Sequence, residues 1–168
     1  LGKKTLLIDA DLRKPVLHKM FQNTGKGITN FLSGNENSIE NIYFSSDTDN
    51  LSIMNAGIVP PNPSELLGSK NMKRFIDKAK KEFDIILIDT PPLIAVTDAF
   101  IIAKYTDKFL LVVRASVTQK GALDRSIANM KNMSHDIHGV IFNGVDDFST
   151  YGGGYYYNYY QAYYGNDK

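Results

Sequence analysis

The chain has 168 residues, of which 43% are hydrophobic and 22% are charged, and its formal net charge is +1. A charge this close to zero gives no basic footprint for nucleic acid, and the absence of cysteine excludes disulfides and thiolate metal sites. No apolar run approaches the roughly 20 residues that span a bilayer. The length favours one domain, residues 1–150, followed by a tail, residues 151–168.

Four apolar runs have the length and β-branched content of buried strands. In chain order they are Thr5–Asp9, Asp84–Asp89, Phe109–Val113 and Gly139–Asn143, and Leu51–Ala56 is a weaker fifth candidate. The four runs do not alternate apolar with polar residues, so we expect helices on both faces of the sheet. The connections are long enough for crossover helices. The sequence therefore predicts an α/β fold with a doubly wound, mostly parallel sheet.

Two of the connections predict helices. The first helix spans Ser64–Glu82, with Ser64 as its N-cap, and follows a proline-rich loop at Pro60–Pro63. The second helix follows Thr118. The apolar stripes are Leu67, Phe75, Ile76, Ala79 and Phe83 in the first helix, and Leu123, Ile127 and Met130 in the second. We expect both stripes to pack in the core.

Aspartates follow two of the predicted strands. Asp9 and Asp11 come at the end of the first strand, and Asp89 ends the strand that begins at Asp84. A single aspartate in such a position is a turn cap as often as it is a functional residue. The same arrangement at two strand ends favours a ligand-binding site, because ligands of open α/β sheets bind at the carboxyl ends of the strands. Carboxylates on one rim hold a hard cation such as Mg²⁺, and the third acid is then free to act as a base.

Short basic and proline-containing segments flank these acids. Thr90, Pro91 and Pro92 give the strand that ends at Asp89 a stiff exit, which would hold a reacting phosphate in place. Arg13 and Lys14 follow Asp11 and are candidates for phosphate contact, although two cations in an exposed turn are often only solvated.

Three segments and the C-terminal residues resemble the bacterial tyrosine kinases (BY-kinases) of capsule and exopolysaccharide assembly. IDADLRKP (8–15) is similar to their second Walker-type motif, IILIDTPP (85–92) to their Walker B motif, and VPPNPSELL (59–67) to the loop before their central helix. The resemblance covers the whole chain, with the motifs in the family's order. It implies a P-loop NTPase fold of the MinD/ParA type and the cofactors ATP and Mg²⁺.

The resemblance also implies roles for individual residues. It gives Asp9 a place in the magnesium shell, makes Asp11 the candidate base for an incoming tyrosine hydroxyl, and makes Asp89 the Walker B acid near the metal. All three are thus expected as catalytic and metal-binding residues. Nucleotide contacts are expected from Arg13, Thr90, Pro91 and Asn143, the last of which ends its strand where related folds contact adenine, although a turn-forming asparagine explains it equally well.

One motif of the family is missing from this sequence. No G-x-x-x-x-G-K-[ST] segment occurs, so the backbone nest and lysine that hold the β- and γ-phosphates are absent. In the family this loop lies upstream of the first strand seen here. We therefore expect the sequence to begin inside the kinase domain and to bind ATP poorly on its own, while the intact protein binds it. The alternative is a natural relative without the loop.

The C-terminal residues are rich in tyrosine. Eight of the ten tyrosines in the chain lie in this segment, namely Tyr151, Tyr155, Tyr156, Tyr157, Tyr159, Tyr160, Tyr163 and Tyr164. Kinases of this family phosphorylate such tails, so the resemblance implies autophosphorylation in trans within a homo-oligomeric ring that dissolves once the tails are charged. We expect the tail to be flexible, because the glycines 152–154 precede most of these tyrosines.

The family also implies partners and a location. These are a membrane adaptor of the polysaccharide co-polymerase type, a cognate tyrosine phosphatase and a cytoplasmic position at the inner face of the membrane. Two other functions share part of the pattern. A MinD- or ParA-like ATPase would have the same strand-end acids but no reason for the tail, and a non-catalytic phosphoprotein scaffold would fit a chain that natively lacks the phosphate loop.

Overall fold

The computed structural model describes residues 2–145 and shows six strands in two sheets. The larger sheet has the order β2 (Phe44–Ser45), β3 (Leu51–Met54), β1 (Thr5–Asp9) and β4 (Ile85–Asp89). In it β1 runs parallel to both β3 and β4, and the short β2 is antiparallel to β3. The smaller sheet pairs β5 (Leu110–Arg114) in parallel with β6 (Gly139–Asn143). The predicted mostly parallel α/β architecture is confirmed.

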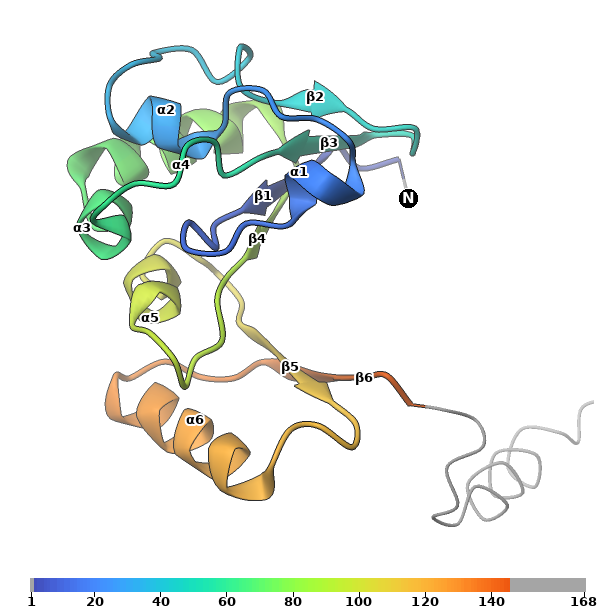
Figure 1. The fold of residues 1–168 in the computed structure, drawn as a ribbon, viewed down its shortest axis with the longest axis vertical. Coiled ribbons are helices and arrows are strands. Elements are labelled where there is room, and N and C mark those ends of the chain that lie inside the picture. Colours follow the sequence, from blue (N-terminus) through green and yellow to red (C-terminus); the bar gives the residue numbers. More distant parts are fainter. Residues whose placement is uncertain (1, 146–168) are drawn as a thin grey trace, which may run out of the picture.

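In residues 2–145, six helices connect and cover these strands (Figure 1). They are α1 (Leu17–Met20), α2 (Ile28–Leu32), α3 (Pro63–Leu67), α4 (Lys70–Glu82), α5 (Asp98–Ala103) and α6 (Lys120–Asn132). Within residues 2–145 none of them has the length and apolarity needed to cross a membrane. In Figure 1, α2, α3 and α4 accompany the larger sheet, whereas α6 lies beside β5 and β6.

The predicted helix at Ser64–Glu82 is wrong in one respect, because it is divided in two. The first piece ends at Leu67 with Gly68 as its C-cap, and α4 begins after Ser69, whose ψ of 162° is extended. Ser64 is not the N-cap. That position belongs to Asn62, with Pro63 in the first turn, where a missing N–H costs nothing. The second predicted helix, α6, has Gln119 as its N-cap.

The hydrophobic core lies between the larger sheet and its helices. Leu6 and Ile8 of the central strand β1 are fully buried, and the rings of Phe31 in α2 and Phe75 in α4 meet edge to face at 5.6 Å. All five residues of the apolar stripe predicted for the first helical segment, of which Leu67 is the first and Phe83 the last, are buried. In α6 only Met130 of the predicted stripe is fully buried, while Leu123 and Ile127 are half-buried. The core thus supports β1, the strand that leads into the acidic segment.

Candidate functional site

The register between β1 and β4 places two of the predicted acids opposite each other. Asp9 is the direct partner of Asp89 in this parallel pair, and the N–H of Ala10 donates to the carbonyl of Asp89 at 2.9 Å. Parallel strands end at the same edge of a sheet, so both aspartates stand at its carboxyl edge, as the sequence predicts.

Asp9 is buried and holds the loop that follows its strand. Its Oδ2 accepts hydrogen bonds from the N–H groups of Val16 and Leu17, each at 2.9 Å. Its Oδ1 is buried and has no hydrogen-bond partner among the described residues. A buried carboxylate oxygen without a partner is costly, so this oxygen is suited to accept a further donor or a cation at the rim.

Asp11 organises the turn after β1. Its Oδ1 accepts hydrogen bonds from the N–H groups of Arg13 at 3.1 Å and Lys14 at 2.9 Å, the side-chain-to-backbone pattern by which aspartate stabilises a turn. The carboxylate is half-buried. The turn therefore fixes the position of this acid relative to Asp9.

The electrostatics of Asp89 show that the three carboxylates interact. Burial raises the pKa of Asp89 above its usual value, because it removes water from around the charged carboxylate, and the negative charges of Asp9 and Asp11 raise this pKa further. A hydrogen bond from the backbone of Thr90 opposes the shift. Because like charges crowd this rim, a cation or a proton placed there would relieve their repulsion.

The rim fits a magnesium ion that keeps most of its water ligands. Within residues 2–145 no group of three or more acidic or histidine side chains is arranged to hold a metal ion. Mg²⁺ usually binds through one or two carboxylates together with water and substrate phosphates, and carboxylate oxygen is the donor it prefers. The unpartnered oxygen of Asp9 and the crowded Asp89 meet that requirement. A shell containing Asp9, Asp11 and Asp89 together stays a prediction.

Arg13, predicted to contact nucleotide, is held by a partly buried hydrogen-bond network. Its Nε donates to Oδ2 of Asp98 at 2.8 Å, and its Nη2 donates to Oδ1 of Asp98 at 3.1 Å and to the hydroxyl of Ser64 at 2.8 Å. The Ser64 hydroxyl in turn donates to Asp98 at 2.6 Å. This network joins the loop after β1 to α3 and α5, so Arg13 positions the loop that carries Asp11.

Asp98 is the member of this network that the sequence analysis missed. It is fully buried at the start of α5. Burial works to raise its pKa, but the hydrogen bonds from Arg13 and Ser64 and the charge of Arg13 outweigh it, so the net shift is downward. The sequence did hold a signal for this residue, because Asp98 directly precedes the apolar run AFIIA. An acid beside such a run is buried only if its charge has a partner.

The other predicted nucleotide contacts lie in two places. Thr90 and Pro91 follow Asp89 directly at the rim, and Pro91 is buried. Asn143 ends β6 in the smaller sheet, opposite Arg114, and its Oδ1 accepts a hydrogen bond from the N–H of Gly144 at 2.8 Å. The eight tyrosines from Tyr151 to Tyr164 lie outside the described residues.

Residues 1–139 match a protein family model described as an AAA domain. The chain is 40% identical, over 154 residues, to the tyrosine-protein kinase CpsD of Streptococcus agalactiae, and the match covers 90% of this chain and 67% of that protein. It is also 40% identical, over 86% of its length, to a putative tyrosine-protein kinase in the cps region of Klebsiella pneumoniae. The chain spans only about a fifth of the length of that protein, 20%.

Solved structures agree with the sequence comparisons. The crystal structure of the VpsO kinase domain superimposes with a TM-score of 0.80 at 35% identity, covering 86% of this chain and 71% of that one. The septum site-determining protein MinD of Pyrococcus horikoshii, solved with Mg-ADP, superimposes with a TM-score of 0.64 at 20% identity, over 84% of this chain and 58% of that one. The second likeness establishes the fold alone, which is the MinD-type fold that the sequence predicts.

The charge crowding at the rim predicts that Asp89→Asn stabilises the metal-free fold at neutral pH. A carboxyl whose pKa is raised on folding destabilises the folded state above that pKa, and the penalty disappears once the pH falls below the unfolded value of about 3.9. The gain in free energy of unfolding should therefore be present at pH 7 and absent near pH 3. Urea unfolding in the presence of a chelator measures it, with Asp49→Asn in an exposed loop as the control. A loss of stability at pH 7 would contradict the repulsion.

The network around Asp98 predicts a large cost for Asp98→Ala. Removing one partner of a buried ion pair costs about 3–5 kcal/mol, and the lower end applies because the Arg13 side chain is 38% exposed. Asp77→Ala is the matched control, since it removes an equally short ion pair, 2.7 Å, from the exposed face of α4 and should cost less than about 1 kcal/mol. Equal midpoints of urea unfolding for the two variants would show that the network does not stabilise the fold. Because folding lowers the pKa of Asp98, its contribution should be complete above pH 5 and fall as the pH drops below about 4.

Proposed function

This chain belongs to the AAA-domain family of bacterial tyrosine kinases, and on that premise we propose that the intact protein is an ATP-dependent protein-tyrosine kinase that phosphorylates its own C-terminal tyrosines. The observation that supports this activity most directly is the carboxylate rim, where Asp9 and Asp89 pair across β1 and β4 and Asp11 stands in the adjoining turn. Its counterpart is the supply of eight tyrosines beyond residue 150.

In the proposed reaction the tyrosine oxygen attacks the γ-phosphorus of ATP. A new bond forms between that oxygen and phosphorus, the bond from phosphorus to the β–γ bridging oxygen breaks, and ADP leaves with the electron pair. The carboxylate of Asp11 takes the hydroxyl proton, because a phenol with a pKa near 10 is protonated at neutral pH. Asp9 and Asp89 are the candidate ligands of Mg²⁺, which when bound neutralises charge on the phosphates.

The remaining predicted contacts have different support. Thr90 and Pro91 stand next to Asp89 and are proposed to border the phosphates. Arg13 is engaged by Asp98 and Ser64, which supports a role in positioning the Asp11 turn over direct contact with phosphate. Asn143 is proposed to contact the base. The family's phosphate-binding loop has no counterpart in this sequence, so we propose that the rest of the polypeptide provides it.

The names of the relatives support a role in polysaccharide assembly. One relative is a kinase encoded in a cps region, and we propose that this protein likewise regulates synthesis and export of a capsular or extracellular polysaccharide. The proposal includes a homo-oligomeric ring in which tails are phosphorylated in trans, a membrane adaptor of the polysaccharide co-polymerase type, a cognate tyrosine phosphatase, and a position at the inner face of the cell membrane.

Asp11→Asn in the full-length protein should lower tail phosphorylation about 100-fold or more, because the substitution keeps the size of the side chain and removes the proton acceptor. The measurement is phosphotyrosine formed after addition of ATP and Mg²⁺, with circular dichroism to verify the fold. Asp49→Asn serves as the control and should keep full activity, since it lies in an exposed loop. A near-normal phosphotyrosine signal in Asp11→Asn would make that aspartate a turn cap only. A wild type that hydrolyses ATP without forming phosphotyrosine would be an ATPase of the MinD type instead.

The tail should act through accumulated charge. Each phosphotyrosine carries about −1.5 to −2 charges, so a single Tyr→Phe change among the eight removes about an eighth of the added charge and should be mild. Changing all eight to phenylalanine should keep the assembled state in the presence of ATP, while glutamate at most positions should favour monomers, and salt should partly reverse that effect. Light scattering on the full-length protein with and without ATP and Mg²⁺ measures assembly. If one single change equalled the effect of all eight, a single-site latch would replace the graded mechanism.

A further inference from the structure

The hydroxyl of Ser64 serves contacts outside its own helix. Ser64 is the second residue of α3, and no side chain caps the start of this helix. Its hydroxyl donates to Oδ1 of Asp98 at 2.6 Å and accepts from Nη2 of Arg13 at 2.8 Å. A hydroxyl that donates and accepts at the same time has a fixed orientation, so Ser64 holds two charged groups at set positions relative to α3.

Asp98 receives hydrogen bonds from the guanidinium on both of its carboxylate oxygens. Oδ2 accepts from Nε of Arg13 at 2.8 Å, and Oδ1 accepts from Nη2 at 3.1 Å. Such a two-pronged contact fixes the plane of the guanidinium, which a single ion pair would leave free to turn. Among the described elements, α5, which carries Asp98, packs mainly against α3, which carries Ser64. The two residues therefore act as one anchor for Arg13.

The anchored arginine is bonded to the proposed base through its backbone. The N–H groups of Arg13 and Lys14 donate to the same oxygen of Asp11, at 3.1 Å and 2.9 Å. The side chain of Arg13 is thus held by α3 and α5, while its amide holds Asp11. The hydrogen bond to Asp98 is the main cause that raises the pKa of Arg13, and the charges of Asp98 and Asp11 add to it. Arg13 therefore also interacts with Asp11 electrostatically.

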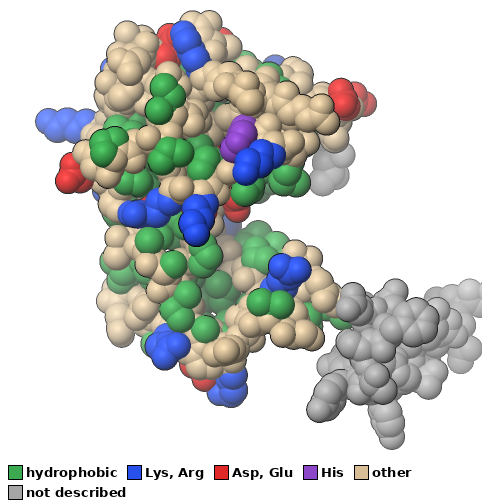
Figure 2. Space-filling model, in the orientation of Figure 1, with side chains coloured by type: hydrophobic (Ala, Val, Ile, Leu, Met, Phe, Trp, Pro, Cys, Tyr) green, Lys and Arg blue, Asp and Glu red, His purple; other side chains and the backbone are tan. Residues whose placement is uncertain are grey.

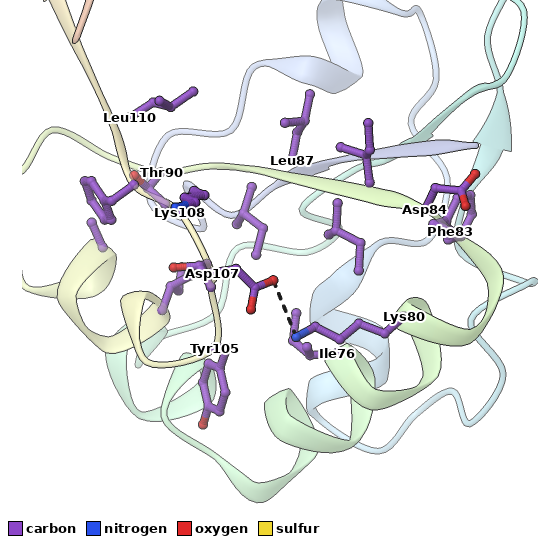
Figure 3. A pocket seen from close by; sticks show the side chains of 17 residues that line it. Ile76, Lys80, Phe83, Asp84, Leu87, Thr90, Tyr105, Asp107, Lys108 and Leu110 are labelled. Carbon is purple, nitrogen blue, oxygen red and sulfur yellow. Dashed lines mark ion pairs between the residues drawn. The ribbon is translucent and has the colours of Figure 1, made fainter. Parts of the chain in front are cut away.

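The helix α5 lies between this network and a groove. Ile102 of α5 and Thr90, which follows β4, are among the residues that line the groove, whose volume is about 610 Å³. Figure 2 shows the molecule hollowed between its two parts, and Figure 3 shows Thr90 in the groove and the ion pair between Lys80 and Asp107, at 3.7 Å. Among the described residues the groove leaves this side of α5 open, so the hold of α5 on the loop after β1 depends on the contacts of Asp98.

We propose that Asp98 and Ser64 are positioning residues for phosphoryl transfer, which hold Asp11 in place through the side chain and the backbone of Arg13. The proposal rests on the proposed kinase function, in which Asp11 takes the proton of the tyrosine hydroxyl. A base must lie about 2.6–3.2 Å from the oxygen whose proton it takes, and a displacement of about 1 Å costs about 100-fold in rate. The network acts on the chemical step and not on nucleotide binding.

Ser64→Ala in the full-length protein tests the proposal without removing a charge. The substitution deletes two hydrogen bonds and leaves the ion pair between Arg13 and Asp98, so the fold should persist. We expect the rate of tail phosphorylation at saturating ATP to fall about tenfold, while the KM for ATP stays within about twofold. Ser46→Ala is the matched control and should keep full activity. Ser46 is also half-buried, and its hydroxyl also donates and accepts, with Thr48, at the amino edge of the sheet.

Residue-resolved amide hydrogen exchange reads the position of the turn without any activity. The amides of Arg13 and Lys14, which are bonded to Asp11, should exchange about tenfold faster in Ser64→Ala, while the amide of Leu7 in β1 keeps its rate. Unchanged exchange at both amides, or an increase in KM as large as the loss in rate, would overturn the proposal. A wild type that forms no phosphotyrosine would refute the kinase function itself, and the exchange rates would still show whether the network holds Asp11.

Chemical rescue separates positioning from a direct contact of Arg13 with phosphate. In Arg13→Ala of the full-length protein, added guanidinium ions fill the space beside Asp98 but cannot restore the covalent link to the amide that holds Asp11. Positioning therefore predicts that guanidinium raises the phosphorylation rate less than about twofold over the same concentration of sodium chloride, whereas a guanidinium acting on phosphate predicts recovery of about tenfold or more. Recovery of that size would overturn the proposal. Circular dichroism verifies that the variant is folded.

Discussion

The in-register parallel pairing of β1 with β4 is the constraint on which the site depends. Five consecutive partners, ending in Asp9 opposite Asp89, fix the two acids at one edge of the sheet. A slip of one residue would turn each side chain to the other face and separate them. The buried side chains of β1 prevent such a slip, because Leu6 and Ile8 would then lose their places in the core. Core packing and site geometry therefore depend on the same register.

The site gathers like charges and then holds them in place. The carboxylate of Asp9 accepts hydrogen bonds from two backbone N–H groups, and Asp11 accepts from two more. Burial first, and then the charges of Asp9 and Asp11, raise the pKa of Asp89. The ion pair between Arg13 and Asp98 anchors the intervening loop to α5. Like charges held together in this way cost stability in the free protein, a cost that a bound cation would relieve.

The two sheets differ in how they are connected to the rim. The acids of the rim lie at the ends of β1 and β4 and in the turn after β1, whereas β5 and β6 are attached to this sheet through α5 and its connecting segments. A fold whose strands are apolar throughout requires neighbours on each inner edge as well as helices on each face. Leu87 and Leu110 are exposed on strands that have one edge without a neighbouring strand among the described residues.

The sequence alone determined five of the six strands in residues 2–145, because continuous apolar runs leave few other assignments, and it determined the acidic strand ends and the family. The short strand β2 was not predicted. It did not determine the break between α3 and α4, the role of Ser64, or the buried acid at Asp98. Those features arise from contacts between distant residues: Arg13 and Asp98 are separated by 85 positions, and Ser64 and Asp98 by 34. A local pattern records propensity and periodicity, whereas the partner of a buried charge and the free edge of a strand are fixed only when the chain is packed.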